Sequence, residues 1–214
     1  MKGVSSVIRV LIADDHQLVR DGLRGILATA SGIEVTAEAA NGDETLALVR
    51  ARPFDVALLD MSMPGLAGID LIKRLKIERP QLHILVLSMH GEQQYAARAL
   101  KAGAAGYLTK DAASEQLVSA LRKVAAGGVA ISDAAAASLL ASARGGDAPP
   151  HTRLSDREFE VFRLLAAGRT PTEIADQLRL SVKTVSTHKA QVQQKLGLAS
   201  SAELVRYALE HDLI

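Results

Sequence analysis

The 214-residue chain contains no cysteine and no tryptophan. The absence of cysteine excludes disulfide bonds, thiolate metal sites and a cysteine nucleophile. Aromatic residues make up only 3% of the chain, so aliphatic side chains must fill its core. The N-terminal residues lack the long apolar region of a signal peptide, and no apolar run approaches the length of a membrane span. We therefore expect a soluble, cytoplasmic protein with no membrane partner.

Overall charge does not indicate a class of partner, because the formal net charge is only +1. One local pattern differs. No acidic residue occurs between Asp176 and Glu203, although four basic residues do: Arg179, Lys183, Lys189 and Lys195. A basic stripe of this kind indicates contact with a polyanion such as DNA, although a solvated helix face would have the same composition.

The most informative stretch runs from Val56 to Gly65. A short apolar segment ends there at the carboxylate of Asp60, and Pro64 and Gly65 follow. Such a segment is typical of a strand that is buried on both faces of a parallel sheet, and the Pro-Gly pair predicts a turn. Asp60 is thereby predicted to lie at the carboxyl end of a buried strand, where open α/β sheets build their sites.

Four other segments also have the pattern of strands. The five predicted strands are residues 7–13, 33–39, 56–60, 83–88 and 106–110. Helical periodicity or helix-capping signals follow each of them. This alternation predicts an α/β fold, a (βα)5 doubly wound parallel sheet, for which we expect the strand order 2-1-3-4-5.

In that order, reactive side chains gather at one edge of the sheet. Asp14 and Asp15 follow the first strand and would lie beside Asp60, while Ser88 ends the fourth strand and Lys110 the fifth. A like pair of carboxylates about 4 Å apart costs roughly 4 kcal/mol at an effective dielectric near 20, so we expect a protonated carboxyl or a bound cation. Oxygen ligands favour Mg²⁺, which would leave Asp60 able to attack phosphorus and form an acyl phosphate. Lys110 and Ser88 would then bind phosphoryl oxygens.

The composition changes after Gly128. Residues 129–150 contain an alanine-rich stretch, which predicts a short helix, and then a run of glycine and proline that is typical of a linker. We therefore predict a first domain over residues 1–128 and a second over 151–214. The second domain is predicted to hold four helices, whose start signals lie at Ser155, Thr170, Ser181 and Ser200.

The second and third of these helices are joined by a short turn, which is the arrangement of a helix-turn-helix. Val185, Val192 and Leu196 form the inward stripe of the third helix, and His188 lies at the border of that stripe. The other side supplies candidates for base edges, which are Lys183, Ser186, Thr187, Ala190, Gln191 and Gln194, with His188 as a further DNA-contact candidate. The candidates for phosphate contacts are Arg179, Lys189 and Lys195.

Two sets of motifs resemble known families. The segments Ala13–His16, Asp60 with Met63–Gly65, Ser88 and Gly106–Asp111 resemble a two-component receiver domain. The segments Leu154–Glu158, Glu173–Ala175 and Lys183–His188 resemble a LuxR-type helix-turn-helix. As a whole, the chain resembles a bacterial response regulator of the NarL/FixJ family.

For the sheet edge that carries Asp14, Asp15 and Asp60, here called the acidic edge, this resemblance implies that Asp60 is the phospho-acceptor of a sensor histidine kinase, with Mg²⁺ as the cofactor. It implies that Asp15 is a direct Mg²⁺ ligand, that Asp14 acts through water, and that Ser62 contributes its backbone carbonyl.

The resemblance also implies a switch pair. Ser88 would move to the phosphoryl group, and the ring of Tyr107 would follow into the vacated space. Ser62 and His90 flank the site at positions that tune the lifetime of the phosphoryl group.

Phosphorylation of Asp60 is expected to favour a homodimer that binds double-stranded promoter DNA. No catalytic residue is assigned, and the chain is not expected to be an enzyme. The alternative is a DNA-binding regulator whose receiver is not controlled by phosphorylation. A phosphatase is disfavoured because Ser62 stands where such enzymes need a second aspartate. A quorum regulator is disfavoured because the N-terminal half has almost no aromatics to line a ligand pocket.

Overall fold

The computed structural model describes residues 7–66, 68–88, 93–112, 114–132, 136, 149–211 and 213–214. Contacts divide the chain into two compact units, one of Met1–Gly91 with Ala99–Ser132 and the other of Glu92–Arg98 with Asp133–Ile214. His90 and most of the predicted alanine-rich helix lie outside the described residues. Among the described residues, no helix has both the length and the hydropathy that a membrane crossing requires.

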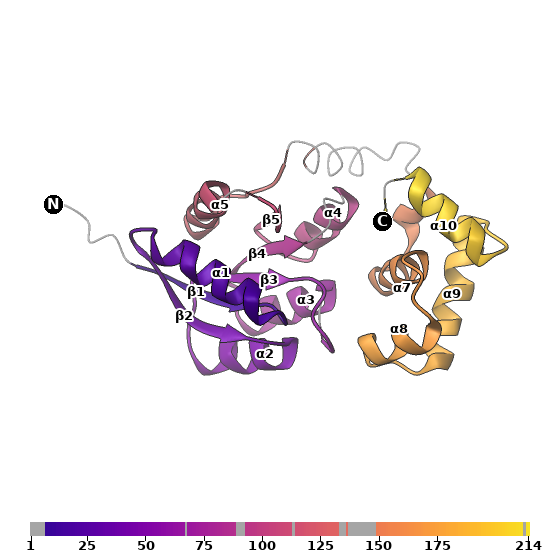
Figure 1. Cartoon of the computed structure of the whole chain (residues 1–214), viewed down its shortest axis with the longest axis horizontal. Coiled ribbons are helices and arrows are strands. Elements are labelled where there is room, and N and C mark those ends of the chain that lie inside the picture. The colour runs from indigo at the N-terminus through magenta and orange to yellow at the C-terminus, as the bar shows by residue number, and fades with distance from the viewer. Residues whose placement is uncertain are drawn as a thin grey trace. The chain divides into compact units, whose positions relative to one another are not determined.

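The first unit contains a five-stranded parallel sheet (Figure 1). Its strands are β1 (Ile8–Ala13), β2 (Ile33–Ala39), β3 (Val56–Asp60), β4 (His83–Ser88) and β5 (Gly106–Thr109). They lie in the order β2-β1-β3-β4-β5, so the predicted doubly wound order is confirmed. Because β1 and β3 are neighbours, the chain reverses its winding direction between them, and this is the place where doubly wound sheets bind ligands.

Helices alternate with these strands, as the sequence predicted. They are α1 (Gln17–Ala28), α2 (Gly42–Ala51), α3 (Gly68–Glu78), α4 (Gln93–Lys101) and α5 (Ser114–Ala125). Leu27 of α1 and Leu121 of α5 pack in one cluster with Val10 and Leu58 of the sheet. Figure 1 shows α2 and α3 across the sheet from α5. Helices on both faces explain why every residue of β3 is buried.

In the second unit, residues 149–211 form a short 3₁₀ turn and four α-helices. The turn is η1 (Pro150–Arg153), and the helices are α7 (Asp156–Ala166), α8 (Pro171–Leu178), α9 (Val182–Leu196) and α10 (Ser201–Glu210). The capping boxes predicted at Ser155 and Thr170 are both present, which confirms the starts of α7 and α8. Ser181 caps α9, which ends at Gly197 in a left-handed conformation with φ 68°.

Candidate functional site

The parallel sheet brings the predicted polar residues to one edge. Asp14 comes directly after β1 and Asp60 ends β3, the neighbouring strand. Ser88 ends β4, and Lys110 directly follows β5. The two acids are almost fully buried, with Asp14 1% exposed and Asp60 2% exposed. Burial at this edge makes their charges costly unless a cation lies nearby.

Lys110 supplies a positive charge between the two acids. Its Nζ atom donates to Asp14 Oδ2 at 2.6 Å and lies 3.1 Å from Asp60 Oδ1. Burial alone would lower the pKa of Lys110, but the hydrogen bond to Asp14 and the charge of Asp60 raise it above its ordinary value. Lys110 is therefore firmly cationic. It already lies beside the carboxylate that is the predicted phospho-acceptor.

Asp14 is held by protein groups at all of its polar atoms. Its backbone N–H donates to the carbonyl oxygen of Ala39 at 3.1 Å, and its own carbonyl accepts from Arg20 Nη1 at 2.6 Å. In the side chain, Oδ1 accepts from the backbone N–H of His16 at 2.9 Å, and Oδ2 accepts from Lys110. This pattern leaves Asp14 less capacity to bind an ion directly than an aspartate whose oxygens lack hydrogen bonds.

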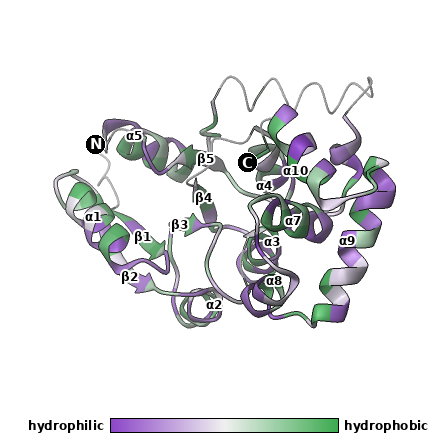
Figure 2. Cartoon of the chain, turned by 45° about the vertical axis from the view of Figure 1, so that its right-hand side comes forward, coloured by the Kyte–Doolittle hydropathy of each residue, from purple (hydrophilic) through white to green (hydrophobic). Residues whose placement is uncertain are grey.

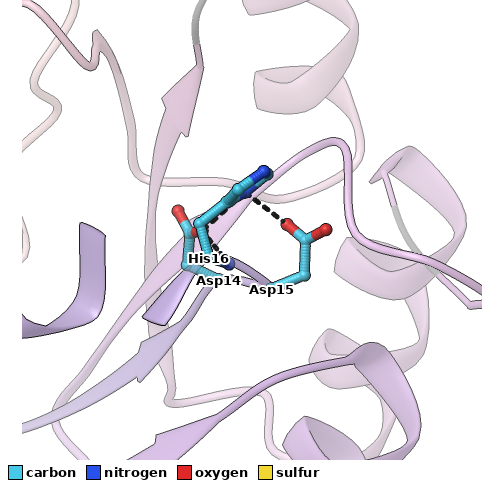
Figure 3. Close-up of side chains that lie close together, drawn as sticks. All are labelled: Asp14, Asp15 and His16. Atoms are coloured by element: carbon cyan, nitrogen blue, oxygen red, sulfur yellow. Dashed lines mark hydrogen bonds and ion pairs between the residues drawn. The ribbon is translucent and has the colours of Figure 1, made fainter. Parts of the chain in front are cut away.

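Asp15 and Asp60 differ from Asp14 in this respect. Asp15 Oδ1 and both carboxylate oxygens of Asp60 are buried and have no well-formed hydrogen bond among the described residues. The ligand atoms of Asp14, Asp15 and His16 all lie within 4.8 Å of one another (Figure 3). Buried carboxylate oxygens without well-formed hydrogen bonds fit a hard cation such as Mg²⁺. Burial raises the pKa of Asp60, and the nearby Lys110 opposes that rise.

His16, for which no role was predicted from the sequence, lies over Asp14 and Asp15. Its Nδ1 atom is 3.0 Å from Asp15 Oδ1 and 3.5 Å from Asp14 Oδ1 (Figure 3). Its side chain is 67% exposed, so it lies on the solvent side of the acids. Its position directly after two aspartates in the sequence was the signal that could have identified it.

The remaining residues predicted for this site lie around Asp60. Ser88 is 3% exposed and Tyr107 is 6% exposed, and both belong to strands next to each other in the sheet. The ring of Tyr107 is therefore buried in this structure. Ser62 follows β3 by two residues and is exposed. The edge thus combines three carboxylates, a lysine and a buried hydroxyl, which is a set suited to holding a phosphoryl group.

The second candidate surface is the exposed side of α9. Val185 and Val192 are fully buried and Leu196 is 9% exposed, as the inward stripe requires. The predicted base-edge residues are exposed: Lys183, Ser186, Thr187, Ala190, Gln191 and Gln194. In Figure 2, α9 carries both hydrophobic and hydrophilic residues along its length. Arg179 ends α8 in a left-handed conformation with φ 52°, and it is exposed.

Two other predicted DNA contacts, Lys195 and Lys189, have partners inside the second unit. Lys195 Nζ donates to Glu158 Oε2 at 2.6 Å, and Lys189 Nζ donates to Ser201 Oγ at 2.9 Å. Burial alone would raise the pKa of Glu158, but hydrogen bonds from Lys195 and Ser155 lower it. His188 is half-buried, and its Nδ1 atom has no hydrogen-bond partner among the described residues. The apolar periodicity of α9 did not predict these contacts or the partial burial of His188.

Both parts of the chain match known protein families. Residues 10–122 match the response regulator receiver domain, and residues 152–208 match the bacterial regulatory proteins of the luxR family. The chain is 38% identical to the transcriptional regulatory protein MctR of Rhizobium johnstonii, over 97% of this chain and 95% of that protein. It is 36% identical to the response regulator GacA of Pseudomonas aeruginosa, over 97% of this chain and 98% of that protein.

A solved structure is similar over nearly the whole chain. It is RcsB from Salmonella enterica serovar Typhimurium, bound to promoter P1flhDC in the presence of phosphomimetic BeF3−. The two chains are 31% identical with a TM-score of 0.72, and the match covers 94% of this chain and 98% of RcsB. The matched families are those of transcription regulators and not of enzymes. The chain is therefore a response regulator of the NarL/FixJ family, with a receiver domain followed by a LuxR-type helix-turn-helix.

Proposed function

We propose that this protein is a transcription regulator that a sensor histidine kinase controls by phosphorylating Asp60. The receiver comprises residues 1–128, the linker 129–150 and the DNA-binding domain 151–214. Phosphorylation favours a homodimer that binds double-stranded promoter DNA in the cytoplasm. A coupling free energy of about 1–3 kcal/mol between the two events would change DNA affinity roughly 5- to 150-fold.

The observation that carries this proposal is the state of the Asp60 carboxylate. It is almost fully buried, its oxygens lack well-formed hydrogen bonds among the described residues, and a lysine ammonium lies 3.1 Å away. A carboxylate kept for structure alone would normally have its hydrogen bonds satisfied. Two buried carboxylate oxygens at a sheet edge, with an ammonium beside one of them, fit a nucleophile that receives a phosphoryl group from outside.

The chemistry follows from these positions. An Asp60 oxygen attacks the phosphorus atom of a phosphorylated kinase histidine, a P–O bond forms, and the P–N bond to the imidazole breaks. The imidazole nitrogen keeps the electron pair and takes up a proton. Lys110 then pairs with a phosphoryl oxygen, Ser88 donates a hydrogen bond to another, and Tyr107 moves with Ser88. Mg²⁺ held by Asp15, Asp60 and the Ser62 carbonyl, with Asp14 acting through water, would offset the negative charge of the carboxylates and the phosphoryl group.

Incubation with acetyl phosphate tests the acceptor. We expect the wild-type protein to gain the mass of one phosphoryl group in the presence of Mg²⁺ and none when Mg²⁺ is chelated. The Asp60→Asn variant should gain none under either condition, because an amide cannot form the acyl phosphate. Intact-protein mass spectrometry provides the measurement. Equal uptake by Asp60→Asn would place the acceptor elsewhere, and an Asp60→Asn variant that binds DNA as well as the phosphorylated wild type would contradict the switch.

The DNA-binding surface can be tested with sequences selected from a random library by the phosphorylated wild type. We expect Gln191→Ala to lose about 1–3 kcal/mol of binding free energy on the selected sequence and little on unrelated DNA, because Gln191 is assigned to a base edge. Arg179→Gln is the comparison, because Arg179 is exposed and assigned to a phosphate, so its loss should be similar on selected and unrelated DNA. Equal losses on selected and unrelated DNA for Gln191→Ala would assign that side chain to the phosphate backbone.

A further inference from the structure

The geometry points to Arg20 as a positioning residue for the metal ligands of the phosphorylation site. This inference rests on the proposed function, because it concerns the Mg²⁺ that phosphoryl transfer to Asp60 would use. Arg20 belongs to α1 and is only 8% exposed, which is rare for an arginine. It has no assigned role in the chemistry described above. The hydrogen bonds of its guanidinium explain why it is buried.

The Arg20 guanidinium joins three parts of the receiver. Nη1 donates to the carbonyl oxygen of Asp14 at 2.6 Å, at the end of β1. Nε donates to Glu38 Oε2 at 3.3 Å, on the neighbouring strand β2. Nη2 donates to Gln17 Oε1 in the first turn of α1. The positive charge is therefore balanced by Glu38, and the hydrogen bonds form a fork that ties the start of α1 to both strands.

The contact with Asp14 determines the direction of Asp15. A carbonyl oxygen and the next residue's N–H belong to one rigid peptide plane. Holding the Asp14 carbonyl therefore sets the orientation of the plane between Asp14 and Asp15, which places the backbone nitrogen of Asp15 and restricts the directions open to its side chain. The other side of Asp14 is fixed by its N–H, which donates to Ala39 at 3.1 Å. Arg20 thus supplies the second of the two anchors that aim Asp15 at the site.

The chain contains a matched control for this contact. Arg24, one turn later on α1, also pairs with Glu38, through Nη1 and Oε1 at 2.7 Å. Arg24 has no hydrogen bond to Asp14 among the contacts of the described residues. Its side chain is 54% exposed, compared with 10% for Arg20. Replacing Arg24 removes a Glu38 ion pair and leaves the Asp14 peptide plane in place.

Metal affinity of the full-length protein measures the effect directly. Mn²⁺ serves as the probe, because the electron paramagnetic resonance signal of the free ion reports how much is bound. We expect Arg20→Met to bind Mn²⁺ about 10- to 100-fold more weakly than wild type, which is the typical effect of losing a group that orients a ligand. Arg24→Met should stay within roughly twofold of wild type. Arg20→Lys keeps the charge but loses the fork, so it should resemble Arg20→Met.

A second control separates positioning from general loss of stability. Val124→Ala removes buried apolar volume on α5, in the core of the receiver. It should lower the thermal unfolding midpoint while its Mn²⁺ affinity stays at the wild-type value. With acetyl phosphate as donor, Arg20→Met should raise the half-saturating Mg²⁺ concentration and change the rate at saturating Mg²⁺ far less.

The outcomes distinguish this inference from the function on which it rests. Wild-type affinity in Arg20→Met, or an equal loss in Val124→Ala, would overturn the role of Arg20 and leave the metal site standing. No binding of Mn²⁺ by the wild-type protein would overturn the metal site and the inference together. The positioning role is supported if Arg20→Met and Arg20→Lys bind Mn²⁺ more weakly while Arg24→Met and Val124→Ala bind it as the wild type does.

Discussion

Replacing Lys110 with methionine should destabilise the receiver by about 3–5 kcal/mol at pH 7, which is the typical effect of removing one member of a buried ion pair. Lys110 is the cation within 2.6 Å of Asp14 and 3.1 Å of Asp60, and all three side chains are at most 10% exposed. Methionine preserves most of the apolar stem and removes the charge. The two buried carboxylates are then left without their ammonium partner, so the folded state must protonate one of them or unfold more readily.

Mg²⁺ should restore part of the stability that Lys110→Met loses, because it supplies positive charge to the same carboxylates. A ligand that binds only the folded state at 100 times its dissociation constant stabilises it by about 2.7 kcal/mol. Adding Asp60→Asn to Lys110→Met should also restore stability, because it removes one of the uncompensated charges. Hydrogen exchange of peptides from β1 and β3, read by mass spectrometry, reports the receiver without interference from the second unit.

Lys101→Met provides the comparison for Lys110→Met. Lys101 is an exposed lysine at the end of α4, and a surface substitution of this kind changes stability by about 0.5 kcal/mol or less. If Lys110→Met behaved like Lys101→Met, the balance of charge at the sheet edge would have to come from another group. A large loss that Mg²⁺ does not reduce would also contradict the assignment of a cation site at Asp15 and Asp60.

Acidification should weaken the second unit by up to about 3 kcal/mol between pH 6.5 and pH 4, at 1.36 kcal/mol per pKa unit. The group responsible is His151 of η1, which is 1% exposed. Burial lowers its pKa to about 4, and the neighbouring charge of His211 adds to the effect. Its Nδ1 atom is 3.0 Å from the hydroxyl oxygen of Tyr207, and Nε2 has no partner among the described residues.

The direction of the stability change follows from the pKa of His151 in the folded and in the unfolded chain. Above about pH 6.5, His151 is neutral in both the folded and the unfolded chain, so the stability of the unit is complete. As the pH falls, the unfolded chain binds a proton that the folded unit binds only near pH 4. The unfolded state is therefore favoured progressively across this interval.

The measurement is hydrogen exchange of peptides from α7 and α10, corrected for the intrinsic pH dependence of exchange. It must report the second unit alone, because burial also lowers the pKa of His83 in the receiver. His151→Asn is the matched variant, since an amide oxygen can accept from Tyr207 but does not titrate in this range. Its exchange should change much less between pH 6.5 and pH 4. Identical slopes in both proteins would assign the acid sensitivity to other groups.

The arrangement of the acidic edge could be predicted from sequence because its residues follow strand ends. Once the strand order is known, Asp14, Asp60 and Lys110 must meet, since parallel strands all end at the same edge. Arg20 was not predicted, because in the sequence it is one polar residue among the apolar positions of an amphipathic helix. Besides Gln17 on the same helix, its partners are the backbone carbonyl of Asp14 and the Glu38 carboxylate of β2, and neither of these leaves a local sequence pattern.

In the second unit, the helix starts could be predicted from sequence, but the contacts between distant residues could not. Capping signals at Ser155 and Thr170 identified the helix starts, because a cap depends on residues three positions apart. The surroundings of Lys195 could not be identified in this way. It was assigned to DNA phosphate from the charge pattern, and its ion pair with Glu158 joins residues 37 positions apart. The assignments of individual DNA contacts, and the domain limits at residues 128 and 151, stay predictions.

The carboxylate of Glu158 fastens the first turn of α7 and the last turn of α9 to each other. It accepts from the backbone N–H of Ser155 at 2.6 Å and from Lys195 at the same distance, while Val185 and Val192 fill the core beneath α9. This contact restricts the movement of the end of α9 relative to the start of α7. We therefore expect a regulatory signal to change how two copies of the domain assemble on DNA, while the internal structure of each copy stays the same.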